Sequence, residues 1–392
     1  MNRIIHLAPQ WPTQYQTFVR DDIEISASVF DSVLVYGFNT SEQGLRKKIF
    51  WLKKFLFALF GISKVLFMNP LIGFNSLKEL GIKNSTHYLS IIGKMPFIIE
   101  SSYILHCHFL AHTSEVGSHL ARLNSKLVLV STAHGSEVLL REDYRLISLA
   151  NRFDFLIFAS NAILENLKEK SIGFNEPLIA NVSVRYCRTP NSLDSFVDSR
   201  NFEGAIDFLS IGRMHPQKGW DKCLYIAKMM KDTGLNFRWI LIGDGPELER
   251  LVLLANEMHL TDHVIFMGYK SREYCLQALN MAHFTVMPSV ITKTDCDGLP
   301  VVILEAMRAS SIVISTEVGG IPEALANGRG LLFKNFDEQV IQVIESLIKN
   351  PDKIEKMRYS AKEWAIENTG FSDTDKLICT YKQSIIKNAN AY

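Results

Sequence analysis

Short β-rich runs and longer amphipathic runs alternate along both halves of this chain, and this alternation restricts the fold more than any other feature. In the second half, strands are predicted at 207–212, 237–243, 264–269, 283–289 and 312–317. The first half repeats the pattern, with predicted strands at 2–9, 32–38, 103–109, 126–135 and 153–160. Strands that alternate with helices form parallel sheets covered on both faces. The expected fold is therefore α/β, with two doubly wound, Rossmann-like domains.

One segment interrupts both patterns. Residues 185–205 are rich in Ser, Asn, Asp and Pro, which makes them the predicted linker. The expected domains are then 1–190 and 200–370, and a C-terminal helix at 371–392 is expected to pack back on the first domain. Open parallel sheets bind ligands at the carboxyl ends of their strands. We therefore expect the two domains to face a cleft that holds the site.

Charge and cysteine content exclude several classes of protein. The 392 residues include 42 basic and 41 acidic residues, a formal charge of +1, which argues against binding nucleic acid through overall charge. Six cysteines are scattered without a C-x-x-C pair, as in a reducing compartment. The start of the chain reads as a strand, without a long apolar signal core. A cytoplasmic protein is expected.

The segment 45–78 departs from this neutrality. No acidic residue occurs between Glu42 and Glu79, while basic residues alternate with bulky apolar ones. This pattern favours a helix lying on the anionic inner membrane surface, and the lysines within the apolar run argue against a spanning helix. The alternative is a core-facing helix whose lysines are simply solvated.

The stretch DCDGLPVVILE, 295–305, predicts an anion site at the start of a helix. Pro300 suits the first helical position, so the amides of Val301, Val302 and Ile303 would lack intrahelical partners and attract a diphosphate. Gly298 would let the backbone approach that ligand closely. Asp297 before the helix and Glu305 in its second turn would accept hydrogen bonds from different hydroxyls of one elongated ligand, as expected for a sugar nucleotide.

A second element, SIGRMHPQKGWD at 210–221, follows a predicted strand. It places Arg213 and Lys218 on the loop between that strand and the next helix. A guanidinium and an ammonium there can neutralise a diphosphate leaving group. Each residue alone would be an ordinary solvated charge, and it is their position that predicts an anion clamp.

These motifs, with LIGDGPELERL, VIFMGY, MPSV and DGLPVVILEAMRASSIVISTEVGGIPEAL, resemble the donor domain of the retaining GT-B glycosyltransferases of family 4, over about 207–370. The resemblance is greatest to enzymes that build bacterial exopolysaccharide, lipopolysaccharide or colanic acid. It implies that Arg213 and Lys218 hold the donor diphosphate and that Glu305 binds the ribose. Asp297 would address the donor sugar. The implied nucleotide-binding positions are Gly212, Gly268, Tyr269, Lys270, Gly298, Leu299, Pro300, Val301 and Val302.

Two positions depart from the family pattern. Asp297 stands where the family carries a glutamate, one methylene longer. The loop after the first strand, APQWPTQYQTF, lacks the family's glycine pair, and Gln16 and Thr17 are assigned to that loop by their position alone. The identity of the donor sugar is what these departures leave open.

Histidines supply further candidates in the first half. His134 follows a predicted strand and precedes Gly135, and the resemblance places a histidine there beside the donor sugar, while the alternative is a structural loop histidine. In HCHFLAH, His106 and His108 share one strand face, and His108 is a candidate substrate contact. No ligand cluster completes a metal site in the sequence, so no metal is predicted.

The expected activity is retaining transfer of a sugar from a UDP- or GDP-sugar to a saccharide acceptor. That acceptor could be polyprenyl-linked, and no metal or other cofactor is expected. No side chain stands out as a nucleophile, so the departing phosphate would assist the incoming hydroxyl on the same face of the sugar. The alternatives are a nucleotide-sugar epimerase of the same fold and a non-catalytic sugar-nucleotide-binding partner.

Overall fold

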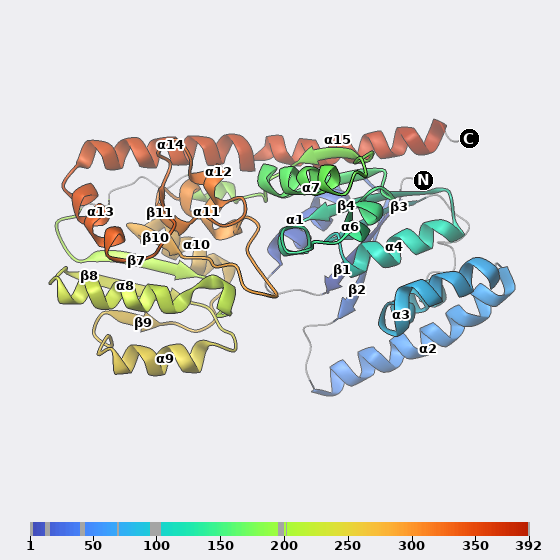
Figure 1. The fold of residues 1–392 in the computed structure, drawn as a ribbon, viewed down its shortest axis with the longest axis horizontal. Coiled ribbons are helices and arrows are strands. Elements are labelled where there is room, and N and C mark those ends of the chain that lie inside the picture. Colours follow the sequence, from blue (N-terminus) through green and yellow to red (C-terminus); the bar gives the residue numbers. More distant parts are fainter. Residues whose placement is uncertain are drawn as a thin grey trace. The chain divides into compact units, whose positions relative to one another are not determined.

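The computed structural model describes residues 3–11, 16–39, 44–68, 70–94, 103–194, 200 and 202–390 (Figure 1). The chain divides into two compact units, and each is described by itself. Unit 1 comprises Met1–Ala159, Ile163–Arg185 and Thr374–Tyr392, and unit 2 comprises Ser160–Ala162 and Tyr186–Asp373. The chain thus leaves unit 1 near residue 185 and returns to it for its last helix.

Unit 1 is built on a six-stranded parallel sheet in the order β2-β1-β3-β4-β5-β6. Its strands are β1 (Arg3–Gln10), β2 (Ser32–Asn39), β3 (Tyr103–His108), β4 (Leu127–Ala133), β5 (Phe155–Phe158) and β6 (Asn181–Val184). Its helices are α1 (Thr17–Ala27), α2 (Gly44–Met68), α3 (Pro70–Lys94), α4 (His112–Leu123), α5 (Ser136–Leu139), α6 (Tyr144–Ala150), α7 (Asn161–Gly173) and α15 (Phe371–Asn390).

Alternate residues of the unit 1 strands fill two separate cores, one on each face of the sheet. Ile5 and Leu105 belong to the larger core, whereas their neighbours Ile4 and Ile104 belong to the smaller one. This is the period of two that a doubly covered strand requires. Helix α15 contributes Tyr381 to the smaller core, so the last helix covers that face of the sheet.

Unit 2 repeats the architecture with the order β12-β11-β10-β7-β8-β9. Its strands are β7 (Ile206–Ile211), β8 (Phe237–Ile242), β9 (Val264–Phe266), β10 (Phe284–Met287), β11 (Ile312–Thr316) and β12 (Leu331–Phe333). Its helices are α8 (Trp220–Asp232), α9 (Leu248–Glu257), α10 (Arg272–Met281), α11 (Val301–Arg308), α12 (Ile321–Leu325), α13 (Glu338–Ile348) and α14 (Pro351–Thr369), with 3-10 turns η2 (Asn191–Leu193) and η3 (Pro216–Lys218). Two parallel sheets covered by helices confirm the predicted α/β fold class.

Candidate functional site

Two loops meet at the carboxyl ends of the neighbouring strands β7 and β10 in unit 2. The first loop contains η3, and the second runs from Pro288 to Pro300 ahead of α11. The amide of Val290 donates to the carbonyl of Gln217 at 2.8 Å, which ties the loops together. The side chains of Gln217 and Asp295 add a second link of 2.7 Å. The two motifs predicted to form one anion site therefore lie side by side.

Lys218 and Asp297 form an ion pair at this junction. The Lys218 Nζ atom lies 2.7 Å from Asp297 Oδ1, and the other carboxylate oxygen accepts a 2.6 Å bond from Ser289. The two side chains are only 16% and 12% exposed. An ammonium carries three N–H donors and a carboxylate about four acceptor sites. The pair therefore keeps donors for a phosphate oxygen and acceptors for a hydroxyl.

Arg213 lies at the start of the same loop. Its side chain is exposed, while its carbonyl accepts a 3.1 Å bond from the Trp220 indole. Gly212 precedes it directly after β7, and the stem of Lys218 passes beside that glycine. The loop backbone is thus fixed, and the Arg213 guanidinium extends into solvent.

Helix α11 begins one residue later than predicted. Pro300 has an extended backbone (φ −61°, ψ 127°) and is the N-cap, so the helix starts at Val301. The Pro300 carbonyl accepts a hydrogen bond from the Ile303 amide at 3.0 Å. The prediction that the Ile303 amide lacks a partner within the helix was therefore wrong. The first-turn amides of Val301 and Val302 remain without an intrahelical acceptor. Gly298 and Leu299 are buried immediately ahead of them.

Glu305 has a basic partner that the motif did not reveal. Its carboxylate lies 3.1 Å from the guanidinium of Arg272, the first residue of α10, and only 12% of its side chain is exposed. The loop before α10 carries the predicted positions Gly268, Tyr269 and Lys270. The carbonyl of Gly268 accepts the Gly243 amide at 3.0 Å, so the loops after β8 and β9 are in contact.

Gly319 holds the Asp297 loop against the turn after β11. Its φ is +54°, a left-handed conformation, and a Cβ there would lie 2.2 Å from the Gly298 carbonyl oxygen and 2.4 Å from that of Asp297. The neighbouring Gly320 amide donates to the Gly298 carbonyl at 2.6 Å. Glycine is required at 319 both for its φ and for this close approach.

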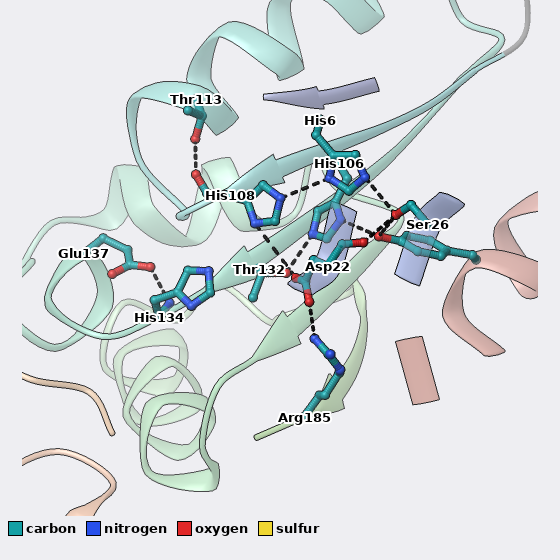
Figure 2. A network of polar contacts seen from close by, with 11 residues as sticks. His6, Asp22, Ser26, His106, His108, Thr113, Thr132, His134, Glu137 and Arg185 are labelled. Atoms are coloured by element: carbon teal, nitrogen blue, oxygen red, sulfur yellow. Dashed lines mark hydrogen bonds and ion pairs between the residues drawn. The ribbon is translucent and has the colours of Figure 1, made fainter. Parts of the chain in front are cut away.

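In unit 1, three buried histidines form a hydrogen-bond network on β1 and β3 (Figure 2). His6 and His106 are paired across the two strands, and His108 follows on the same face as His106. His6 Nδ1 lies 3.0 Å from His108 Nε2, and His6 Nε2 lies 2.8 Å from Ser26 Oγ. His106 bonds Tyr381 at 2.8 Å and Thr132 at 2.7 Å.

The network continues into α1 and to the residue after β6. Ser26 lies within hydrogen-bond distance of His6, the Asp22 carbonyl and Tyr381. His108 Nδ1 lies 3.9 Å from the Asp22 carboxylate. Asp22 is also paired with the buried Arg185. The predicted face shared by His106 and His108 is present, but His108 is fully buried and closed to solvent.

One nitrogen from each of His6, His106 and His108 lies within 4.8 Å of the others. Such a cluster has the composition of a transition-metal site. However, both nitrogens of His6 and both of His106 already have protein partners. A metal ion would have to replace these bonds, so the contacts favour a hydrogen-bond network.

His134 lies just past the carboxyl end of β4, as predicted. Its ring packs between Phe18 and Phe109, with centroid distances of 4.2 and 4.6 Å. Its Nε2 atom is buried and has no hydrogen-bond partner among the described residues. Burial lowers the pKa of His134 well below its ordinary value, which keeps the ring neutral. Glu137 anchors the loop by accepting the amides of His134 and Gly135.

Gln16 and Thr17, the residues assigned to the loop after the first strand, lie at the start of α1. Gln16 is the N-cap of that helix and Thr17 its first residue, and both are half-buried. The preceding residues 12–15 of this loop lie outside the described residues. The structure thus places Gln16 and Thr17 at a helix start that follows β1.

The histidine network gives a testable pH dependence. Burial lowers the pKa of His108 from 6.5 to about 4, and lowers those of His6 and His106 well below 6.5. The unfolded chain therefore binds protons that the folded chain excludes, so their stabilising effect is complete above pH 6.5 and is lost as the pH falls toward 4. Each such histidine should steepen the loss by about 1.4 kcal/mol per pH unit. Thermal unfolding followed from pH 7.5 to 5 should show a falling midpoint.

One variant tests the contribution of this network. His106→Gln should reduce the slope of the midpoint against pH, because it removes one fully buried histidine. A midpoint that is the same at both ends of the pH range would contradict the prediction.

Several site residues escaped the sequence analysis. Ser289 is the second residue after β10, so the strand-end rule could have found it, and Arg272 opens the helix after a loop already singled out. His6, Asp22, Arg185 and Tyr381 carried no local signal, because their contacts join distant parts of the chain.

Residues 193–364 match the model of the family described as glycosyl transferases group 1. The chain is 28% identical over 296 residues to an uncharacterized glycosyltransferase, MJ1178, of Methanocaldococcus jannaschii, covering 70% of this chain and 73% of that protein. It is 30% identical over 138 residues to the amylovoran biosynthesis glycosyltransferase AmsK of Erwinia amylovora. That match covers 35% of this chain and spans only 34% of the length of AmsK.

Among solved structures, the chain is similar to Anabaena Alr3699/HepE in complex with UDP-glucose. The TM-score is 0.69 at 16% identity, covering 98% of this chain and 100% of the other. At that identity the likeness concerns the fold alone. The glycosyl transferases group 1 model thus matches most of the carboxy-terminal unit, and the fold, with two parallel sheets each covered by helices, is the GT-B fold.

Proposed function

We propose that this chain transfers a sugar, with retention, from a nucleoside diphosphate sugar to a saccharide acceptor. The observation that carries the proposal is the Lys218–Asp297 pair at the junction of two strand-end loops, within the segment that matches the glycosyltransferase family. The pair offers an ammonium that can donate hydrogen bonds to a phosphate and, beside it, a carboxylate that can accept hydrogen bonds from a hydroxyl. HepE, which has the same fold, was solved with UDP-glucose.

The proposed donor site assigns each group a role by its chemistry. The Lys218 ammonium and the exposed Arg213 guanidinium neutralise the diphosphate, together with the first amides of α11. Asp297 accepts hydrogen bonds from sugar hydroxyls, and Glu305 accepts them from the ribose. Gly268, Tyr269 and Lys270 flank the base. In unit 1, His134, which follows β4, is proposed to orient the donor sugar.

The proposed reaction uses no resident metal and no enzyme nucleophile. The bond between the anomeric carbon and the phosphate oxygen breaks while the acceptor oxygen bonds to the same face of that carbon. The departing phosphate takes the acceptor proton. Cations and oriented amides that stabilise the phosphate as charge develops would lower this barrier.

The acceptor is proposed to be a saccharide of a surface polysaccharide, carried on a polyprenyl lipid at the cytoplasmic face of a membrane. Support comes from AmsK, which is named for amylovoran biosynthesis. The basic and apolar segment 45–78 is a second, independent reason to propose a lipid-linked acceptor.

A panel of nucleotide sugars tests the donor site. One UDP- or GDP-sugar should raise the thermal midpoint, because a ligand that binds only the folded state stabilises it. Glu305→Gln should weaken that binding by roughly 10-fold in calorimetry, since a charge-assisted hydrogen bond is lost. Glu249→Gln, at an exposed position on α9, is the matched control. Equal affinities for wild type and Glu305→Gln would remove Glu305 from the site.

Product analysis separates the reaction classes. With donor and a saccharide acceptor, transfer yields a glycosylated acceptor and a nucleoside diphosphate. With donor alone, an epimerase would yield a new nucleotide sugar, and that product would contradict the proposal.

A further inference from the structure

Helix α2 presents an apolar surface to solvent. Its buried side is a narrow stripe of Lys54, Ala58, Gly61 and Val65, at the spacing of one helix face. On the rest of its described surface, eight large apolar side chains are 36–65% exposed: Trp51, Leu52, Phe55, Leu56, Phe57, Leu59, Phe60 and Ile62. Scattered exposed apolar residues are ordinary, but a contiguous group of this size marks an interaction surface.

The packing of α2 against α3 leaves the outer side of α2 exposed. Figure 1 shows the two helices running side by side in unit 1. They approach so closely that a Cβ on Gly61 would lie 2.0 Å from the Leu89 carbonyl oxygen, and one on Gly93 would lie 1.9 Å from that of Phe57. Because the glycines already bring the backbones together, the apolar residues on the outer side of α2 are not needed to join the helices.

An apolar groove of about 520 Å³ continues the surface between the two helices. It is lined by residues including Phe55, Leu59, Ile62, Leu77 and Ile82, and Ile82 is 91% exposed. Lys78 is also among the lining residues, and its side chain is exposed. The groove therefore combines a mainly apolar lining with one cation.

The positive charge of the α2–α3 hairpin indicates an anionic partner. Residues 44–94, which form the hairpin, contain nine basic residues and one acidic residue, Glu79. The side chains of Lys53, Lys78, Lys83 and Lys94 are exposed, whereas those of Arg46, Lys47, Lys48 and Lys64 lie outside the described side chains. A symmetric dimer through this surface would bring like charges together. An anionic bilayer instead complements both the lysines and the apolar residues.

We infer that the α2–α3 hairpin docks the protein on an anionic phospholipid bilayer, with the outer side of α2 among the acyl chains and the groove open to one of them. None of the described helices combines the length and hydrophobicity required to span a membrane. The hairpin therefore lies in the interface. This docking rests on the proposed function, because it would bring the protein to a lipid-linked acceptor. The hairpin belongs to unit 1 and the donor-site residues to unit 2, so the two proposals can be tested separately.

Cosedimentation of the full chain with vesicles tests the inference. Wild type should bind phosphatidylcholine vesicles that contain about a third phosphatidylglycerol, and should bind pure phosphatidylcholine much less, because surface lysines add to the apolar attraction. Phe55→Ser with Phe60→Ser should weaken partitioning by roughly 10-fold or more, since two exposed aromatic rings no longer enter the lipid. Both rings are more than half exposed, so the fold should tolerate the change.

The matched control is Ile172→Ser with Ile179→Ser, which removes two isolated apolar side chains of unit 1 that are 80% and 74% exposed. This control should bind the vesicles as wild type does. Absence of wild-type binding, or equal losses in both double variants, would overturn the inference. The inference would also be overturned if the wild type were a dimer in lipid-free solution and the Phe55→Ser, Phe60→Ser variant were a monomer. Donor binding, measured by thermal shift, should be the same in all three proteins, which separates this test from that of the donor site.

Discussion

Replacing Lys218 with methionine is expected to lower the rate of sugar transfer by about 10²–10³-fold, the range found when one preorganised group that stabilises transition-state charge is removed. Methionine keeps an apolar stem beside Gly212 and removes only the ammonium. The Asp297 carboxylate would keep its bond from Ser289 but lose its ion-pair partner. The expected cost in stability is about 1–3 kcal/mol, far smaller than the effect on turnover.

Lys228→Met is the matched control for this prediction. Lys228 lies on α8 of the same unit and pairs with Asp232, but their side chains are 38% and 58% exposed. Initial rates at saturating donor, together with thermal midpoints, should therefore show wild-type activity for Lys228→Met. A Lys218→Met protein that turns over within a few-fold of wild type would refute the anion clamp.

Gly319→Ala should have the largest effect on the shape of the donor site. The substitution adds the strain of a left-handed alanine and places a Cβ within 2.4 Å of two carbonyl oxygens, those of Asp297 and Gly298. We expect a loss of about 2–4 kcal/mol in the free energy of unfolding, from backbone strain plus overpacking. Because the contacting carbonyls belong to the Asp297 loop, donor binding should be lost as well.

Gly328→Ala distinguishes the two causes. Gly328 has a φ of +76°, and a Cβ there would meet no atom within 4 Å. That variant should lose only about 1 kcal/mol and should bind donor normally. Denaturant unfolding and donor calorimetry of both variants provide the measurement. Equal costs at the two positions would show that Gly319 is needed only for its backbone angle.

The sequence predicted the elements of the two sheets where the strands are buried. β3 and β4 are buried along their whole length, and each begins with an apolar run, Tyr103–Leu105 and Leu127–Val130, that predicts a strand. β6 and β12 were missed because they are four and three residues long and partly exposed, which leaves too short a pattern to read. The loops after β7 and β10 were predicted as site loops because each follows a strand that is recognisable as an apolar run.

The candidate site was predicted through its motifs but not through its pairings. Lys218 and Asp297 were assigned separate ligands, and the structure shows that they also neutralise each other. That contact depends on which strands are neighbours, and β7 lies beside β10 only because of the sheet order. The same reason hides the link between His106 and Tyr381, which are 275 residues apart.

The return of α15 to unit 1 also sets an order for synthesis on the ribosome. Unit 2 is almost continuous in the chain, so it can acquire its structure as soon as residue 373 has emerged. The sheet of unit 1 is translated first, yet one of its faces is covered only in part until Leu377 and Tyr381 are made. The first-made half of the protein is therefore the last to be completed.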